Sequence, residues 1–303
     1  MKLTIQTSSH MRVERGQFVI QIGRCRDPER KLTTGVRHLS KDKALQLEVL
    51  ADDLGRIDQV DKTVKALVRL NKPHWRLALS LWSNWLDEVP ESVWELANME
   101  ELRLNRNSLK TISPAIVKLA KLRKLCIGWN PLVCFPEVVC KLEQLDELSA
   151  IRCQLSVLPS SFASLRNLLE LSLGGNAFEQ FPAVICELKS LRELRLENNK
   201  LSSLPRSFVN LRELTVLDLS KNLFKEFPAV VCELTNLTHL IITYNELSEM
   251  PLSITKLIHL EILNLSGNLF TSFPLFIGDL PRIWRYCVSG WFNRSARFSC
   301  LHK

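Results

Sequence analysis

Residue types that commonly perform catalysis are thinly spread along this 303-residue chain. The six histidines stand far apart, at His10, His38, His74, His239, His259 and His302. We find no phosphate-cradling G-x-x-x-x-G-K, no H-E-x-x-H and no G-x-S-x-G. The pair Gly174-Gly175 lacks the following helix start that lets glycines bind phosphate. We therefore expect a non-enzymatic protein without catalytic residues, cofactor or metal.

Tryptophan and arginine are the residue types here that suit recognition rather than catalysis. They recur at Trp82, Arg103, Arg106, Trp129 and Arg152. Exposed Trp and Arg side chains are enriched among the residues that contribute most to protein–protein affinity. A structural role competes with this interpretation, because four tryptophans crowd residues 75–94 and some could seal an end of the fold. The choice depends on the elements that hold these side chains.

A repeat of 23 residues organises those elements. The pattern L-x-x-L-x-L-x-x-N-x-L-x-x-L-P places an asparagine in register eight times, and Cys153 holds the one remaining slot. Proline follows six residues after each slot except at Ser113. The slots are Asn84, Asn107, Asn130, Cys153, Asn176, Asn199, Asn222, Asn245 and Asn268. Nine such units without an insertion predict a leucine-rich repeat solenoid.

Each column of the repeat has a physical role. Leucines five and three residues before the slot, such as Leu194 and Leu196, alternate on a short strand and share its buried face. The asparagine amide can bond backbone groups of neighbouring coils that would otherwise be buried without partners. The thiol of Cys153 can do only part of this. Apolar residues nine, twelve and fifteen after the slot return the chain along the outer side, as Phe208, Leu211 and Leu214 do.

A second period of 46 residues lies over the first. The segments FPEVVCKL, FPAVICEL and FPAVVCEL begin at Phe135, Phe181 and Phe227. Phenylalanine and leucine alternate in the columns two and five after the slot, which lets adjacent coils interdigitate. Duplication of a two-repeat unit explains this beat. The 46-residue period predicts how adjacent coils pack, and it gives no information about a ligand.

The repeat type resembles that of intracellular leucine-rich repeat proteins, including Ras-pathway scaffolds, the Scribble/Erbin group and plant Ras-group-related proteins. The resemblance covers about Trp75 to Leu280. It implies an α/β fold: a horseshoe-shaped solenoid with a parallel sheet on its concave side. It carries over no catalytic residue, since this fold presents binding surfaces of many kinds.

Charge and cysteine usage bear on partners and compartment. Residues 1–73 hold 15 Lys and Arg against 9 Asp and Glu, and residues 281–303 hold 5 against none, so the net charge of +8 belongs to the ends. Without a basic stripe along the coils, we expect no nucleic-acid partner. Cys140, Cys186 and Cys232 share a column two coils apart, too far for disulfides. We expect a cytoplasmic monomer that does not insert stably into membranes, because no apolar leader or spanning run occurs.

The flanks are interpreted as caps. Residues 1–40 alternate weakly and predict a hairpin or a loose arm. Residues 41–73 predict a helical N-terminal cap, with Leu47, Leu50, Ala51 and Leu54 on one helical face and Val60, Val64, Leu67 and Val68 on another. Residues 74–280 form the nine repeats. Residues 281–303 form a degenerate tenth repeat or a tail.

Function is expected on the strand surface that faces solvent, at positions six, four, two and one before each slot. The candidate protein-binding residues there are Trp82, Arg103, Arg106, Trp129, Arg152, Arg195, Asp218, Lys221 and Tyr244. The sequence predicts a non-enzymatic scaffold or adaptor that binds a protein partner on the concave leucine-rich repeat face, with a role in intracellular signalling. The alternative is the recognition arm of an enzyme such as a ubiquitin ligase, with its chemistry in a flank or in another domain.

Overall fold

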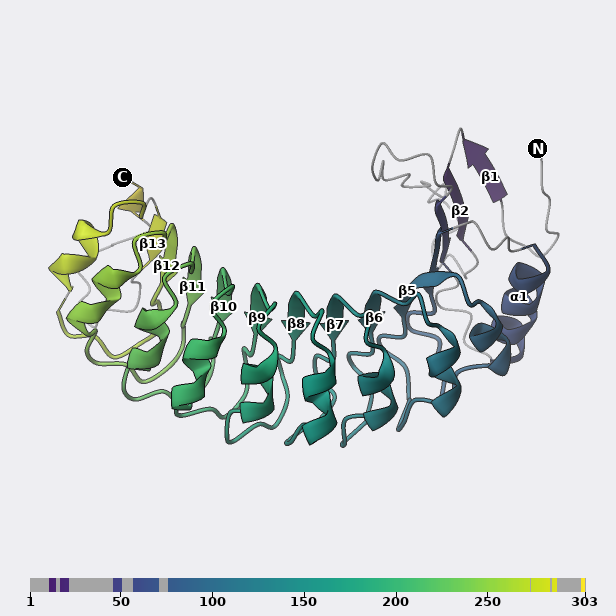
Figure 1. The fold of residues 1–303 in the computed structure, drawn as a ribbon, viewed down its shortest axis with the longest axis horizontal. Coiled ribbons are helices and arrows are strands. Elements are labelled where there is room, and N and C mark those ends of the chain that lie inside the picture. Colours follow the sequence, from purple (N-terminus) through teal and green to yellow (C-terminus); the bar gives the residue numbers. More distant parts are fainter. Residues whose placement is uncertain are drawn as a thin grey trace. The chain divides into compact units, whose positions relative to one another are not determined.

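The structure is a computed structural model, and it describes residues 11–14, 17–21, 46–50, 57–70, 76–272, 274–283, 285–287 and 301–302. The chain divides into two compact units. The first unit comprises residues 1–132 and 136–149, and the second comprises residues 133–135 and 150–303. Within each unit, strands lie along one side of the coils and short 3-10 helices along the other (Figure 1). This is the architecture of a leucine-rich repeat solenoid, as predicted.

The first unit contains a sheet, one α-helix and three 3-10 helices among its described residues. Its strands are β1 (Met11–Glu14), β2 (Gln17–Gln21), β3 (Gln46–Leu50), β4 (Arg76–Ser80), β5 (Met99–Arg103), β6 (Lys124–Cys126) and β7 (Glu147–Ser149). Its helices are α1 (Ile57–Leu70), η1 (Glu91–Glu95), η2 (Pro114–Lys118) and η3 (Glu137–Lys141). Strands β1 and β2 pair antiparallel, and β2 to β7 pair in parallel in chain order.

The second unit repeats one strand and one 3-10 helix. Its strands are β8 (Glu170–Ser172), β9 (Glu193–Arg195), β10 (Val216–Asp218), β11 (His239–Ile241), β12 (Ile262–Asn264), β13 (Arg285–Cys287) and β14 (Leu301–His302). Its 3-10 helices are η4 (Ser160–Ser164), η5 (Ala183–Glu187), η6 (Arg206–Asn210), η7 (Ala229–Glu233), η8 (Leu252–Lys256) and η9 (Leu275–Asp279). Strands β8 to β13 pair in parallel, and β14 joins β13 antiparallel.

The asparagine column forms the hydrogen bonds that its chemistry predicts. The Nδ2 of Asn222 donates to the carbonyl oxygens of Leu196 and Leu219, each at 3.0 Å, and its Oδ1 accepts from the N–H of Leu201 at 3.0 Å. One side chain thus satisfies buried backbone groups of two coils. At Cys153 the sulfur lies 3.6 Å from the carbonyl oxygen of Ile151, a distance typical of a weak S–H donor.

The residue six positions after each slot directly precedes the outer 3-10 helix and caps its start. Proline fixes a φ that suits this position, and its carbonyl accepts the first 3-10 hydrogen bond, as Pro205 does from the N–H of Phe208 at 3.0 Å. Ser113, the exception in the column, caps η2 instead: its Oγ accepts from the N–H of Ala115 at 3.3 Å. A hydroxyl cap thus takes the place of the ring.

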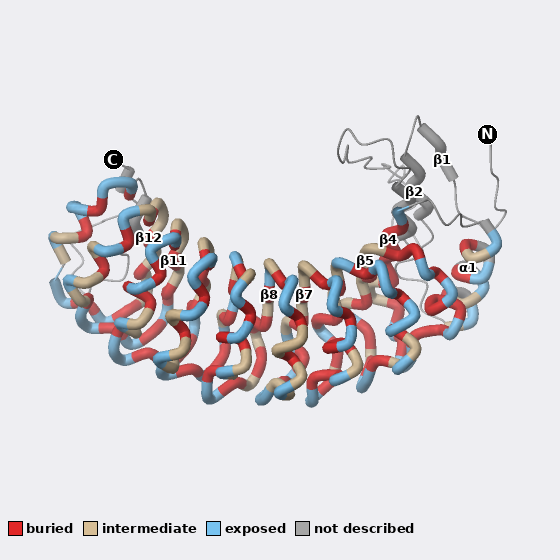
Figure 2. Tube along the Cα trace, viewed as in Figure 1, coloured by how far each residue is buried: buried red, intermediate tan, exposed pale blue. Residues whose placement is uncertain are grey.

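The core lies between the strands and the 3-10 helices of each unit (Figure 2). The predicted columns are confirmed there, since Leu194, Leu196, Phe208, Leu211 and Leu214 are fully buried. The 46-residue beat appears as edge-to-face ring pairs. Phe135 meets Phe162 at 5.1 Å between centroids, and Phe181 meets Phe208 at 5.3 Å. Each pair joins a phenylalanine of one coil to the outer helix of the next.

The expected helical pair at the N-terminal flank is wrong in its first half. Residues 46–50, read as one turn of an amphipathic helix, form strand β3, which lies between β2 and β4. The open edge of β4 is therefore extended by strands rather than covered by a helix, which satisfies its backbone groups directly. The second predicted stretch is the helix α1, with Val60, Val64 and Leu67 buried. Residues 41–45, 51–56 and 71–75, which include Ala51 and Leu54 of the first predicted stretch, lie outside the described residues.

Helix α1 is fixed to the outer side of the first coil. The hydroxyl of Ser92, in η1, donates to the Oδ1 of Asp61 at 2.7 Å, and Lys65 pairs with the same carboxylate at 2.7 Å. These contacts hold the pKa of Asp61 below its ordinary value. None of the helices among the described residues has the length and apolar character needed to cross a bilayer. The predicted hairpin or arm over residues 1–40 falls only partly on described residues, where β1 and β2 pair.

Candidate functional site

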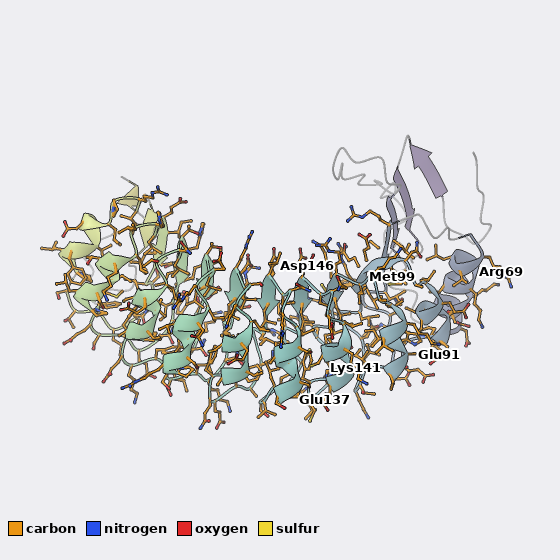
Figure 3. All side chains as sticks on the ribbon, viewed as in Figure 1. Arg69, Glu91, Met99, Glu137, Lys141 and Asp146 are labelled. Atoms are coloured by element: carbon orange, nitrogen blue, oxygen red, sulfur yellow. The ribbon has the colours of Figure 1, made fainter. Side chains whose placement is uncertain are left out.

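We call the side of each unit that carries the outward strand side chains its strand face. In the first unit, Asp146 lies on this side, whereas Glu137 and Lys141 lie on the opposite side, on η3 (Figure 3). The strand face is built from positions six, four, two and one before each slot, because alternate side chains of a strand point to the same side. Each predicted site residue occupies one of these positions.

Three of the predicted residues meet on the strand face of the first unit. The Cζ of Arg106 lies over the ring of Trp82 at 5.3 Å and over the ring of Trp129 at 4.8 Å. Both distances fall within the range of cation–π attraction. Trp129 is 42% exposed, and Arg106 is also exposed. We call these three residues the Trp–Arg–Trp cluster. They come from three successive coils, as the 23-residue register requires.

The other basic residues of this face are held in ion pairs. The guanidinium of Arg103 pairs with Glu101 at 2.5 Å. Exposed pairs of this kind contribute about 0–1 kcal/mol each to stability. Their larger effect is that each positive charge is compensated by a neighbouring carboxylate. On the same face Lys124 pairs with Glu147. The pairs Arg76–Glu100 and Arg123–Asp146 join residues near the starts of the strands, outside the strand-face positions.

The residue directly before each slot adopts a left-handed backbone. Arg106 has a φ of 56° and Trp129 a φ of 58°. The column comprises Ser83, Arg106, Trp129, Arg152, Gly175, Asn198, Lys221, Tyr244 and Gly267, all with φ between 52° and 74°. A residue with a Cβ is disfavoured there by about 1–2 kcal/mol, and glycine is not. Backbone geometry therefore gives no reason for Arg, Trp or Tyr at these positions, so their side chains call for a functional explanation.

The glycine pair of the second unit makes room for neighbouring side chains. A Cβ on Gly175 would lie 2.5 Å from the Cγ of Arg152, and one on Gly174 would lie 2.1 Å from the Oε1 of Glu197. Arg152 and Glu197 therefore lie against the two glycines. The pair accommodates side chains of this chain.

The remaining candidates lie on the strand face of the second unit and form smaller groups. Arg195 pairs with Glu193 at 2.6 Å. The Oδ1 of Asp218 accepts from the N–H of Ser220 at 2.8 Å. The Nζ of Lys221 lies 5.8 Å from the ring centre of Tyr244, which is 62% exposed. Lys221 and Tyr244 thus form a second, weaker cation–π contact.

The tryptophans of residues 75–94 divide between the two roles that were weighed. Trp94 is buried in η1 and seals the first coil, whereas Trp82 is half-buried on the strand face. Trp85 is exposed one residue after its slot. Trp75 lies outside the described residues. Among the residues described, no three His, Cys, Asp or Glu side chains are placed to hold a metal ion.

Glu197 should make the folded protein less stable as the pH rises. Burial raises the pKa of its carboxyl above the ordinary value of 4.5, and its Oε2 is buried without a hydrogen-bond partner. The folded state then binds the proton more tightly than the unfolded state, so this stability is full below 4.5 and is lost as pH rises through the folded pKa. We expect Glu197→Gln to raise the melting temperature at pH 7, with the gain shrinking towards pH 4.5.

Melting curves of both proteins across pH 4.5–8 test this expectation. Glu246→Gln is the matched control, because it neutralises an exposed carboxylate of the same unit. A gain for Glu197→Gln that stays the same at every pH would show that the carboxyl is not strained by burial.

The cysteines should differ sharply in reactivity. Burial raises the pKa of Cys126 to about 11, and it raises those of Cys186 and Cys232 as well. Since the thiolate is the reactive form, these thiols should be alkylated slowly at pH 7.5, whereas the exposed Cys134 should react within minutes. Peptide mass mapping after brief iodoacetamide treatment measures this. Equal labelling of Cys134 and Cys186 in folded protein would contradict it, and unfolded protein serves as the control.

The comparisons with known proteins agree with this architecture. A family model described as a leucine-rich repeat region matches residues 180–266, and two further leucine-rich repeat models match residues 144–201 and 259–280. No curated protein matches the chain. The matched residues begin near the end of the first unit and cover much of the second. The assignment of repeats in the first unit is therefore based on the 23-residue register and on the structure.

Several solved structures are similar to this chain. A leucine-rich repeat protein of Leptospira interrogans shares 27% identity at a TM-score of 0.69, over 80% of this chain and 60% of its own. The ectodomain of the Arabidopsis thaliana receptor kinase GASSHO1/SCHENGEN3, solved in complex with CASPARIAN STRIP INTEGRITY FACTOR 2, shares 29% identity at a TM-score of 0.59. The match covers 71% of this chain and 26% of that ectodomain chain. The chain in a TLR13–ssRNA13 complex shares 25% identity at a TM-score of 0.64, and the match covers 81% of this chain and 36% of that one. The chain thus spans less than two thirds of each.

Proposed function

We propose that this protein is a non-enzymatic binding scaffold that holds a protein partner on the strand face of its first unit. The observation that carries the proposal is the Trp–Arg–Trp cluster. Exposed tryptophan and arginine, packed against each other, are the side chains that most often contribute large shares of interface affinity. The cluster also stands on a rigid, regular backbone, so little ordering is required when a partner binds.

The backbone geometry of the cluster supports a role in recognition. Arg106 and Trp129 occupy left-handed positions where glycine would be favoured. Packing does not require their side chains either, because both are exposed. Large exposed residues at positions that disfavour them fit a surface that serves a partner.

A protein partner suits this face better than a nucleic acid. Among similar structures, one was solved with a protein factor and another with single-stranded RNA, so the fold serves both kinds of ligand. Nucleic-acid affinity depends on many unpaired cations. On the described strand face of the first unit, Arg103 and Lys124 are each paired with a carboxylate. That balance favours a protein.

The cellular setting extends the same proposal. The repeat type resembles that of intracellular scaffolds, and the second unit buries the unpaired thiols of Cys186 and Cys232. Buried free thiols suit a reducing compartment. We therefore place the protein in the cytoplasm, as a monomeric adaptor that takes part in signalling.

Affinity capture tests the proposal. The tagged chain, a Trp82→Ala/Trp129→Ala variant and a Lys189→Ala variant are incubated with the same lysate, and bound proteins are quantified. Lys189 is exposed and follows the outer helix η5, so its replacement leaves the strand face intact. We expect a partner that the chain and the Lys189 variant retain and the double variant loses. Equal retention by all three would contradict the proposed surface.

A further inference from the structure

Arg106 differs from its basic neighbours on the strand face of the first unit. Arg103 pairs with a carboxylate of its own coil, and Lys124 pairs with a carboxylate of the next coil. Among the residues that the structure describes, Arg106 forms no ion pair and no side-chain hydrogen bond; its side chain contacts the rings of Trp82 and Trp129. Its charge is therefore stabilised by ring faces, which leave the hydrogen-bond donors of the guanidinium without acceptors.

An arginine in this state is prepared to bind an oxyanion. A guanidinium presents five N–H donors in a planar fork that matches a carboxylate with two parallel hydrogen bonds. The two rings restrain its position, so part of the side-chain entropy that binding would cost is already lost. The exposed surface of Trp129 lies beside it and can receive an apolar group. One cationic and one apolar contact are thus offered together.

We propose that the Trp–Arg–Trp cluster binds an acidic protein segment, in which an Asp or Glu carboxylate pairs with Arg106 and an adjacent apolar side chain packs on Trp129. This inference rests on the proposed function and adds the chemistry of the partner. The charge of the face selects the occupant, since Arg106 supplies an unpaired positive charge and the paired residues around it supply none. A basic segment would meet Arg106 with like charge and would find its carboxylates already occupied.

A random peptide library displayed on phage provides the probe. The library is selected on the full chain, and the dissociation constants of the best peptides are measured for the chain and four variants. Arg106→Gln removes the charge, and Arg106→Lys keeps the charge without the fork. Trp129→Ala tests the surface itself. Arg206→Gln is the control, because it removes the same charge from an exposed position on the outer helix η6.

The proposal expects selected peptides enriched in Asp or Glu next to an apolar residue. Arg106→Gln should weaken their binding about tenfold to a hundredfold, as expected for loss of a charged hydrogen-bonded pair. Arg106→Lys should recover only a part, and Arg206→Gln should have no effect. Replacing the acidic residue of the peptide by its amide should weaken binding to the chain but not to Arg106→Gln.

The remaining outcomes separate this inference from the proposed function. Peptides that need Trp129 but carry no acidic preference, or bind Arg106→Gln equally well, would overturn the inference and leave the binding surface standing. Peptides that bind Trp129→Ala as tightly as the chain, or the absence of any enriched peptide, would overturn both. Melting curves of all variants confirm that the coils are intact, which is expected because Arg106 and Trp129 are exposed.

Discussion

Leu194→Asp should unfold the second unit. Leu194 lies in the middle of β9, is 0% exposed, and stands between Leu171 of β8 and Leu217 of β10 in the ladder. An aspartate there would bury a carboxylate that no described residue can pair with, and the apolar contacts of the leucine would be lost. Buried unpaired charges belong to the few changes that cost more than about 4–5 kcal/mol. In a solenoid each coil depends on its neighbours, so the damage should spread.

Thermal and urea unfolding, followed by circular dichroism, measures this effect. Lys189→Asp is the control, because it places the same side chain on the exposed outer side of the preceding coil. We expect the control to melt within about 2 °C of the parent, in line with surface substitutions that change stability by less than about 0.5 kcal/mol. An unchanged melting curve for Leu194→Asp would show that the register is wrong.

The repeat architecture was predictable because its signal is redundant. A slot such as Asn222 is supported by the leucines before it and the proline after it, and each requirement has a separate physical cause. The period can therefore be recognised even where one column of the repeat departs from the pattern. The same redundancy explains why Cys153 could replace one asparagine without obscuring the period.

Strand β3 could not be predicted with the same evidence. Leu47, Leu50 and Leu54 satisfy a helical spacing, while the segment Gln46–Leu50 also alternates in the manner of a strand. A run this short fits both periods. The deciding interaction is the unpaired edge of β4, which accepts another strand, and no property of residues 46–50 alone reveals it.

The candidate site was predictable in its positions and less so in its contacts. Counting from the slots placed Trp82, Arg106 and Trp129 on one surface, since strand alternation fixes the side. The ion pair between Arg103 and Glu101 was also accessible, because residues two apart on a strand share a face. The cation–π contacts were not, because they depend on side-chain directions that the period does not specify.

The left-handed column was a signal that the sequence contained and that we did not use. Gly175, Asn198 and Gly267 stand directly before their slots, and these residue types favour positive φ. They indicate the backbone of the whole column, including Arg106 and Trp129. Positive φ at these positions favours Arg106 and Trp129 over Arg103 as candidate binding residues.

Trp129→Ala should reduce partner affinity at least about thirtyfold, equivalent to about 2 kcal/mol or more. The indole supplies the closer of the two rings beside Arg106, at 4.8 Å, and its exposed surface is available to a partner. Removing it takes away both the apolar contact and part of the support of the guanidinium. Trp129 is also a cleaner test than Trp82, which lies nearer the N-terminal flank.

Trp129→Gly separates binding from folding. At a φ of 58°, glycine relieves a strain that alanine retains, so the glycine variant should melt at or above the temperature of the alanine variant. Both should bind the partner equally weakly. A glycine variant that binds normally would mean that the indole is dispensable.

The measurement that tests the central claim most directly is a titration of the captured partner into four proteins: the parent chain, Trp129→Ala, Arg152→Ala and Lys189→Ala. Arg152 is another of the predicted binding residues, and it lies on the strand face of the second unit with its side chain against Gly175. The account predicts full affinity for Lys189→Ala and a loss of at least about thirtyfold for Trp129→Ala. If folded Trp129→Ala keeps the parent's affinity, the surface is wrongly placed, and Arg152, Asp218, Lys221 and Tyr244 on the strand face of the second unit become the candidates.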